Sequence, residues 1–186
     1  MRARRLVALL PLLLTACGYN TIQSYDEKAN AAKQQIEVQL QRRADLVPNL
    51  VEVVRGQAQQ ELEVFTQVAR ARSGLVDAVQ KGDPRQMAEA NEQLTGAMRG
   101  LMIQVEAYPQ IKSDQAFLRL QDELTGTENR IAVSRTDLNG AVETYNTYIR
   151  KFPQVLTAKV IGAKPKEYFE VSNAAAREAP KIDLTK

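Results

Sequence analysis

Apolar side chains recur at alternating spacings of three and four residues along most of this chain, which is the pattern of amphipathic helices. In residues 21–43 these positions form one face, which holds Ile22, Tyr25, Ala29, Ala32, Ile36 and Leu40. The pattern then meets Pro48, and Asp45 suits the N-cap of a new helix that has Pro48 in its first turn. We therefore predict a tight turn near residue 45, with one long helix kinked at Pro48 as the alternative.

Helix-breaking residues divide the rest of the chain into three more helices. The second predicted helix ends near Gln80, before the stop-and-restart sequence Lys81-Gly82-Asp83-Pro84. The third spans residues 84–108, ends before Pro109, and has a face with strict 4-3 spacing that consists of Met87, Asn91, Leu94, Met98, Leu101, Val105 and Tyr108. The fourth spans residues 113–151, with Ser113 as its N-cap. In the segment 154–186 that follows, we expect a turn or short helix at 163–169 and a frayed end.

The 4-3 spacing is typical of helices that pack nearly parallel or antiparallel, and short connections make consecutive helices antiparallel. The predicted fold is all-α: an elongated, antiparallel, up-and-down four-helix bundle over residues 21–153. If the first helix instead passes through Pro48, the alternative is a three-helix bundle whose first helix is kinked there. Two of the predicted helices are short, so we expect the long pair to extend beyond them.

Three polar residues interrupt the apolar stripe of the fourth predicted helix, namely Gln121, Glu128 and Arg135. A charge that leaves water without a partner is strongly destabilising, so these side chains must be paired or hydrated. The second helix offers polar residues beside its own apolar face, and these are Gln57, Glu61 and Arg72. Three interpretations stay open: an internal hydrogen-bonded network that fixes helix register, a shifted stripe that leaves the charges on a solvated rim, and an internal metal or ligand site.

The N-terminus has the layout of an export signal. A basic cluster (Arg2, Arg4, Arg5) precedes the short apolar run 6–14, and small residues then lead to the chain's one cysteine in Leu14-Thr15-Ala16-Cys17. These last four residues resemble a bacterial lipobox, in which the cysteine is lipidated and becomes the first residue of the mature protein. The alternatives are a transmembrane helix, which needs about 20 apolar residues, and cleavage that leaves a free thiol.

We therefore predict a lipoprotein signal peptide at 1–16 and a lipidated Cys17 with a short tether at 17–20. Such a protein is held by its lipid on the extracytoplasmic side of a membrane. In a Gram-negative cell, the glycine after the cysteine resembles the pattern of lipoproteins sorted to the periplasmic face of the outer membrane.

Removal of the signal peptide changes the charge balance. The whole chain has 25 basic and 22 acidic residues, a net charge of +3, and the signal peptide holds three of the arginines and no acid. The mature chain is therefore near neutral, which argues against a nucleic-acid partner. The chain also has no histidine, which excludes Ser-His and Cys-His nucleophile pairs, His-containing zinc sites and the Glu-x-x-His pairs of di-iron bundles. We expect no cofactor and no catalytic residue.

The up-and-down order predicts a cluster of residues at the end of the bundle far from the membrane. The predicted turns near residue 45 and at Pro109 both fall at this end. They gather a distal cluster of six residues, which are Arg42, Arg43, Asp45, Asn49, Glu106 and Tyr108. Two interpretations stay open for this cluster: a partner-binding patch, and simple capping and turn formation.

Motifs along nearly all of the mature chain resemble those of the LemA family. In order they are Tyr19-Asn20, Gln39-Leu40-Gln41-Arg42-Arg43-Ala44-Asp45-Leu46-Val47-Pro48-Asn49-Leu50-Val51, Ala71-Arg72, Glu106-Ala107-Tyr108-Pro109, Leu120-Gln121-Asp122-Glu123-Leu124, Thr127-Glu128-Asn129-Arg130-Ile131-Ala132, Arg135, Tyr145-Asn146, Phe152-Pro153 and Tyr168-Phe169-Glu170. The chain departs from the family at Gln60-Glu61, where His-Glu is usual, and at Leu138-Asn139, where Tyr-Asn is usual. The resemblance implies an antiparallel helical bundle held at a membrane, with no established catalytic activity.

The residues and the resemblance together predict a non-enzymatic scaffold or interaction lipoprotein of the bacterial cell envelope. Its expected partners are the lipid bilayer, through Cys17, and unknown envelope proteins or further copies of itself. The alternative is a metal- or ligand-binding protein, or an enzyme, that uses the inward-facing Glu61, Glu128 and Arg135.

Overall fold

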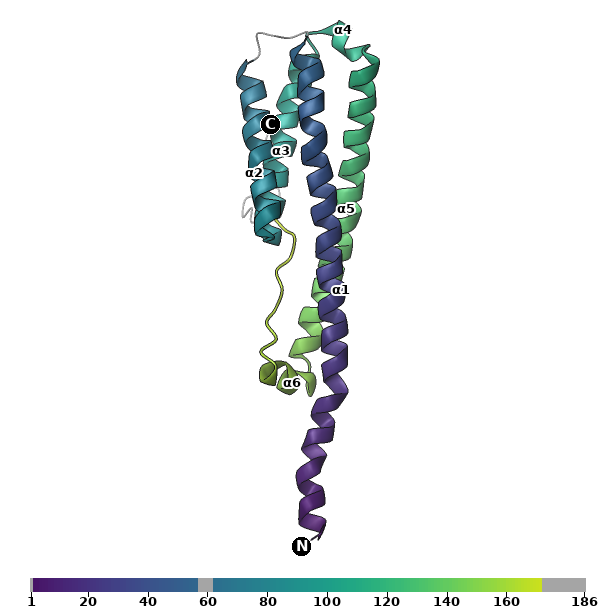
Figure 1. The fold of residues 1–186 in the computed structure, drawn as a ribbon, viewed down its shortest axis with the longest axis vertical. Helices are drawn as coiled ribbons and strands as arrows, with labels where there is room; N and C mark the ends of the chain where they lie inside the picture. The colour runs from purple at the N-terminus through teal and green to yellow at the C-terminus, as the bar shows by residue number, and fades with distance from the viewer. Residues whose placement is uncertain (1, 57–61, 172–186) are drawn as a thin grey trace, which may run out of the picture.

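The computed structural model describes residues 2–56 and 62–171, with the backbone alone for residues 2–17. Its helices are α1 (Arg2–Arg55), α2 (Leu62–Lys81), α3 (Pro84–Val105), α4 (Pro109–Lys112), α5 (Gln115–Arg150) and α6 (Gln154–Val160). In Figure 1, α1 packs antiparallel to α5 and α2 packs antiparallel to α3. The predicted all-α antiparallel bundle is confirmed. The expected fraying of the C-terminal end falls on residues outside those described.

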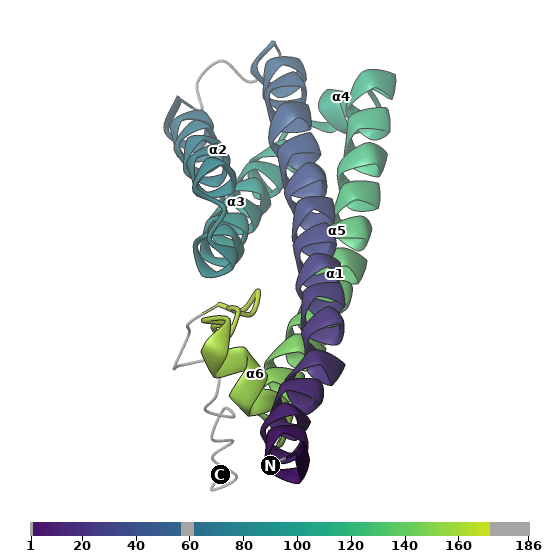
Figure 2. The ribbon, with the colours of Figure 1, turned by 60° about the horizontal axis from the view of Figure 1, so that its bottom comes forward.

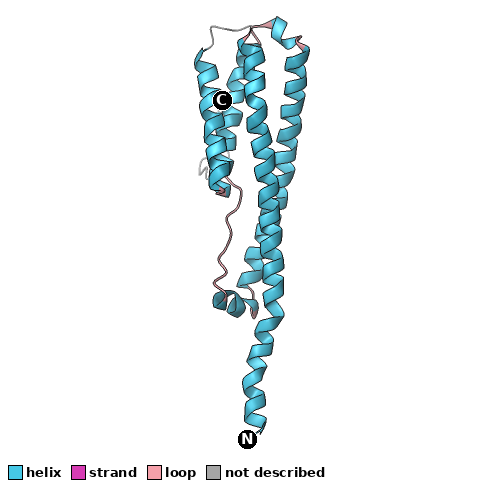
Figure 3. Ribbon diagram, viewed as in Figure 1, coloured by secondary structure: helices cyan, strands magenta, loops and turns pink. Residues whose placement is uncertain are grey.

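Two helices are much longer than the others, and this sets the shape of the molecule. The pair α1–α5 runs the length of the bundle, while α2 and α3 lie beside its upper part (Figures 1 and 3). The lower part of the long pair extends beyond the short pair, as predicted. The short helix α6 packs against α1 and α5 at this overhanging end, which Figure 2 shows from another direction.

The predicted turn near residue 45 is wrong, because α1 continues through Pro48 to Arg55. A proline inside a helix costs about 3 kcal/mol, since it removes one backbone hydrogen bond and crowds the carbonyl four residues earlier. Beyond it, Leu50 and Val54 are fully buried, and each contributes about 1.5–3 kcal/mol. Burial of the last turns of α1 therefore outweighs the local preference to stop, and one helix passes through Pro48. The three-helix alternative does not follow from this, because α1 ends at Arg55 and α2 begins at Leu62, so α1, α2, α3 and α5 still pack as four helices.

A neighbouring helix supplies the hydrogen bond that Pro48 removes. In a regular helix the amide of residue 48 would donate to the carbonyl of Ala44, and proline has no amide hydrogen. Instead, Nε of Arg72, on α2, donates to that carbonyl at 2.8 Å. Ala44 is buried, and a buried carbonyl needs a partner. Arg72 thus joins α2 to α1 at the proline, and it does not contact the polar residues of α5 as expected.

The starts of α3 and α5 follow local rules. Gly82 has a φ of 67° at the end of α2, and the Asp83 carboxylate accepts hydrogen bonds from the amides of Arg85 and Gln86. Burial alone would raise the pKa of Asp83, but these hydrogen bonds outweigh it and hold the pKa below its usual value. The N-cap of α5 is Asp114 rather than the predicted Ser113, because residues 109–112 form the separate turn α4.

Two groups of apolar side chains form the core. The larger one joins α1, α2, α3 and α5, and it includes the predicted face of α3 up to Val105. The smaller one lies at the overhanging end and consists of Ile22, Tyr145, Ile149 and Ala158. It is extended by an edge-to-face contact between Tyr25 and Tyr148, whose ring centroids are 5.1 Å apart. The overhang therefore has a core of its own.

The segment after α6 departs from the prediction. Residues 163–169 form neither a turn nor a helix but an extended strap that runs from α6 back along the bundle (Figure 1). The short helix lies earlier, at 154–160. Gly162, with a φ of 71°, ends α6 and redirects the chain. The strap ends beside the cleft described below.

Candidate functional site

The apolar stripe of α5 is shifted from its predicted course. The buried positions are Phe117, Leu124, Thr127, Ile131, Ser134, Leu138, Val142, Tyr145, Asn146 and Ile149. Thr127 and Ser134 therefore face inward in place of Glu128 and Arg135, and Gln121 is exposed. The Thr127 hydroxyl donates to the Leu124 carbonyl at 2.7 Å, which satisfies it inside the bundle. Of the three interpretations, the shifted stripe is confirmed for these side chains.

Arg43 is the charged residue that enters the interior. Its side chain is only 5% exposed. It donates through NH1 to Oδ1 of Asn91, on α3, at 2.7 Å, and through NH2 to Oε1 of Glu128, on α5, at 3.3 Å. The Glu128 side chain is 54% exposed, so it reaches in from the rim. One guanidinium group therefore joins α1, α3 and α5.

The electrostatic setting of Arg43 is unusual for an arginine. Burial lowers its pKa, and the carboxylate of Glu128 offsets part of that effect. Its Nε, together with Oε1 of Gln39 one helical turn earlier, is buried without a hydrogen-bond partner in the part of the chain described. Each such group costs about 1–3 kcal/mol, so the surrounding apolar core must offset the cost.

The predicted distal cluster does not form as one patch, because its turn is absent. Arg42, Asp45 and Asn49 share an outward surface of α1 with Val38, Gln41 and Leu46, which we call the outer α1 face. Asp45 accepts a hydrogen bond there from Gln41 at 2.9 Å and caps no helix. Arg43 points the opposite way, into the bundle.

The other two members of the distal cluster lie beyond the end of α3. Glu106 is exposed at the α3 C-cap, and Tyr108 is the residue before α4. Tyr108 is half-buried and packs against the large core, which indicates a structural role in the turn. Whether any residue of the predicted cluster binds a partner stays a prediction.

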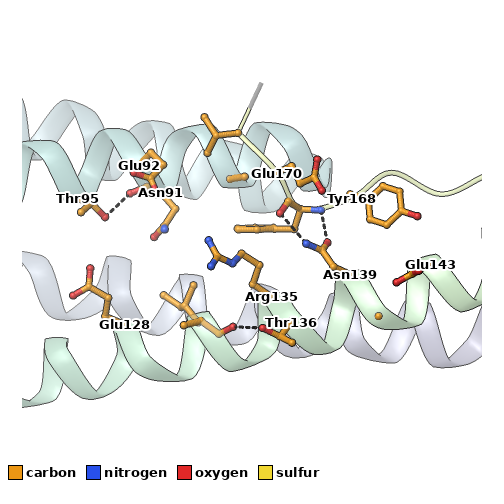
Figure 4. Close-up of a pocket in the computed structure, with 16 residues that line it drawn as sticks. Asn91, Glu92, Thr95, Glu128, Arg135, Thr136, Asn139, Glu143, Tyr168 and Glu170 are labelled. Carbon is orange, nitrogen blue, oxygen red and sulfur yellow. Dashed lines mark hydrogen bonds between the residues drawn. The ribbon is translucent and has the colours of Figure 1, made fainter. Parts of the chain in front are cut away.

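A cleft of about 880 Å³ lies between α3, α5 and the end of the strap (Figure 4). Asn91, Glu92 and Thr95 line it from α3, and residues from Glu128 to Glu143 line it from α5. The Arg135 side chain projects into the space between the two helices (Figure 4). Among the described residues that line it, Glu92, Glu128, Glu143 and Glu170 make the wall acidic, and Arg135 is the basic one.

The strap is held along α5 by two asparagines. Oδ1 of Asn139 accepts from the amide of Phe169 at 2.8 Å, and its Nδ2 donates to the carbonyl of the same residue at 3.3 Å. Asn146 makes the same pair of bonds with Lys166, at 2.8 and 2.9 Å. Seven helical residues span about 10.5 Å, and three extended residues span about 10 Å. The spacing of the two asparagines on α5 therefore matches the spacing of Lys166 and Phe169 along the strap.

Sequence reasoning missed these asparagines, and also missed that Asn91 would bind Arg43. The signal was present, because Asn139 and Asn146 are seven residues apart and therefore on one face of α5. Lys166 adds a third attachment, since its Nζ lies 3.0 Å from Oδ1 of Asp26 on α1 and donates to Oδ1 of Asn30 at 2.7 Å.

The remaining predicted residues have these positions. Gln57 and Glu61 lie outside the described residues, as does the side chain of Cys17. Within the described ranges, no group of three acidic or cysteine side chains is placed to hold a metal ion. No helix, over those same residues, has an apolar stretch long enough for a membrane span.

Comparison with known proteins identifies the family. The model of the LemA family matches residues 32–184. The chain belongs to the LemA family. Magnetosome proteins MamQ 1 and MamQ 2 of Paramagnetospirillum magneticum are each 32% identical to it over 190 residues, which cover 88% of this chain and 68% of theirs. MamQ of Magnetospirillum gryphiswaldense is 31% identical over 187 residues, with the same coverage.

Four of the motifs that resemble those of the LemA family supply contacts between elements in this structure. The motif around Pro48 supplies both Arg43 and the Ala44 carbonyl, and Arg72 comes from a second motif. Glu128 and Asn146 belong to two more. These motif residues therefore hold the long and short pairs and the strap together, which is a structural role.

Proposed function

We propose that this LemA family member is a lipid-anchored, non-enzymatic scaffold of the bacterial cell envelope. The observation that carries this is the position of the lipobox cysteine. Cys17 lies on the overhanging part of α1, about 39 Å below Arg43 at 1.5 Å per residue. An anchor at Cys17 therefore holds the short pair and the cleft away from the membrane, where soluble domains of other proteins reach them.

The relatives reported above are named magnetosome proteins, and this name states no reaction and is compatible with a scaffold. The interior of the bundle also favours a scaffold, because the inward polar groups Arg43 and Asn91 bond directly to each other. A scaffold needs a rigid shape with an accessible side, and the joined α1–α5 pair supplies that shape.

The cleft is the surface that we assign to a protein partner. Its wall carries an excess of carboxylates, which favours a basic partner segment, and charge complementarity promotes association. One side of the cleft is formed by an extended stretch of this chain that asparagine side chains hold by its backbone. The outer α1 face is the competing surface.

The lipid anchor is tested with Cys17→Ser. We expect this variant to keep its helical content by circular dichroism and to lose the mass of the acyl groups on Cys17. We also expect it to leave the membrane fraction that holds the wild-type protein. If the wild-type protein carries no acyl group and is still found in the membrane fraction, the proposed lipid anchor is wrong.

The partner surface is tested by photo-crosslinking in intact cells. A photoreactive amino acid replaces Thr136, in the cleft, or Val38, on the outer α1 face; both positions are exposed, so neither change disturbs the core. We expect a discrete crosslinked protein from position 136, reduced when Glu92 and Glu143 are also replaced, because the basic partner segment then loses two carboxylates. Crosslinks from position 38 alone would move the partner site to α1, and none from either would count against a scaffold.

A second candidate function is the binding of a small polar ligand in the cleft. Its volume lies in the range of small-molecule sites, about 300–1,000 Å³, and Arg135 offers a donor there. Native mass spectrometry of protein purified from its own cells would show a bound mass that Arg135→Ala removes. A spectrum of the apo mass alone, at gentle desolvation, would exclude this function.

A further inference from the structure

The overhanging end of the bundle exposes a group of large apolar side chains. Phe152 is 80% exposed and Val160 is 82% exposed, with Leu156 and Ile161 also exposed. We call these four residues the α6 patch. Leu156 and Val160 are one helical turn apart on α6, so they share a face, while Thr157 and Ala158 on the other side are buried. Contiguous exposed apolar residues mark a site that binds something.

Basic residues flank the α6 patch in the sequence. From Thr144 to Lys166 the chain contains no acidic residue. The same stretch contains five basic ones, which are Arg150, Lys151, Lys159, Lys164 and Lys166. The last is paired with Asp26, and the other four are exposed. An apolar face flanked by lysines is typical of segments that lie in the interface of a bilayer with anionic headgroups.

The patch is fixed beside the start of the predicted mature chain. A Cβ atom built on Gly18 would lie 3.4 Å from Cγ of Gln154, and 3.8 Å from Oγ1 of Thr157, so α1 touches α6 at this residue. Ala158 packs into the small core with Ile22. The neighbour of Gly18 is Cys17, the lipidation site. The α6 patch thus lies at the height at which acyl chains would enter the membrane.

We infer that α6 is a membrane-docking element: its apolar face inserts into the interfacial region of a bilayer while its lysines contact anionic headgroups. The inference deepens the proposed function and rests on Cys17 being anchored. Acyl groups on Cys17 hold the chain at one point only, and a second contact beside that point fixes the tilt of the bundle. The other occupants, a protein partner or a second copy of this chain, are outcomes of the test.

The chain has no tryptophan, so one introduced tryptophan reports its own surroundings. Phe152→Trp places the probe in the patch, and Val133→Trp places a matched control on an exposed position of α5 away from the overhanging end. The full-length protein is processed in its host, purified and reconstituted in vesicles of phosphatidylglycerol and phosphatidylethanolamine. We expect residue 152 to show blue-shifted emission that brominated lipids quench at least twofold, and residue 133 to show neither.

Charge is tested with a triple reversal. Lys151→Glu, Lys159→Glu and Lys164→Glu should remove most of the quenching at residue 152 in anionic vesicles, because each reversal replaces attraction to the headgroups by repulsion. The control reverses three exposed bases away from the overhanging end, Arg42, Arg99 and Lys112, and has the same net charge. We expect this control to leave the quenching unchanged. For the Phe152→Trp protein without charge reversals, we expect vesicles of phosphatidylcholine to reduce the quenching.

The failure of each idea is distinguishable. If the purified protein carries no acyl group, the proposed function fails. The docking of α6 is then tested separately, by measuring the emission of residue 152 after the protein is added to preformed vesicles. In either case, solvent-exposed emission at residue 152 with membrane-bound protein overturns the docking of α6. Blue-shifted emission without lipid quenching would mean that protein rather than lipid covers the patch. A dimer in sedimentation would then assign the patch to a second copy of this chain, and a crosslinked protein would assign it to a partner.

Discussion

Arg43 and Arg42 are neighbours in the sequence with the same chemistry and opposite surroundings. Arg43 is buried and bonded to two helices, whereas Arg42 is exposed on the outer α1 face. A buried charge depends on its partners, and removal of one partner from a buried pair leaves that charge uncompensated. The exposed carboxylate of Glu128 moderates this effect, because water partly screens the pair.

We expect Arg43→Ala to lower the free energy of unfolding by about 2–4 kcal/mol, and Glu128→Ala by about 1–2 kcal/mol. Arg42→Ala, the matched control, should change it by less than about 0.5 kcal/mol. Urea denaturation followed by circular dichroism measures all three. Equal effects of the two arginine substitutions would show that the buried contacts of Arg43 do not contribute to stability.

Pro48 and Arg72 show how one helix depends on another. Pro48 has no amide hydrogen, so α1 lacks one backbone hydrogen bond there. The Arg72 side chain of α2 donates to the Ala44 carbonyl in its place. The element α1 therefore extends through a residue that would end an isolated helix, because a partner and a buried apolar face support it there.

We expect Arg72→Met to lower the free energy of unfolding by about 1–3 kcal/mol, since it leaves a buried carbonyl without a donor. In a Pro48→Ala background the cost should fall below about 0.5 kcal/mol, because the amide of residue 48 then donates to Ala44. Arg70→Met, at an exposed position of the same helix, is the control. A double-mutant cycle measures the coupling, and equal costs in both backgrounds would refute the link.

The strap joins the overhanging end of the molecule to the cleft. It leaves α6 at the overhang, and the paired hydrogen bonds of Asn146 and Asn139 hold it along α5 as far as the cleft. The buried side chain of Phe169 then joins the large core. The cleft and the membrane-facing end are thus parts of one connected unit.

We expect the double substitution Asn139→Ala and Asn146→Ala to release the strap while the helices stay folded. The amides of Lys166 and Phe169 should then exchange hydrogen at least tenfold faster, as each loses its acceptor, and trypsin should cleave the released strap after Lys166. Asn129→Ala, at an exposed position of α5, serves as the control. Unchanged exchange at both amides would mean that other contacts hold the strap.

Much of the architecture follows from local pattern. The helical faces, the junction at Gly82-Asp83-Pro84 and the end of α3 were predicted because caps and periodicity act within one or two turns. The inward faces of α1 and α3 were also correct, since each contains apolar residues without interruption by charge. On α5, the choice between residues 127 and 128, and between 134 and 135, was wrong, because polar residues occupy both neighbouring positions.

The sequence by itself determined an antiparallel helical bundle, and it predicts an anchor at Cys17 at one end of it. The tertiary structure alone decided that α1 passes through Pro48, that Arg43 rather than Arg135 enters the interior, and that residues 163–169 form a strap. Each of these depends on partners far away in the chain: Arg72 for Ala44, Asn91 for Arg43, and the two asparagines for the strap. Local propensity does not contain these contacts, because they exist only after the helices have packed.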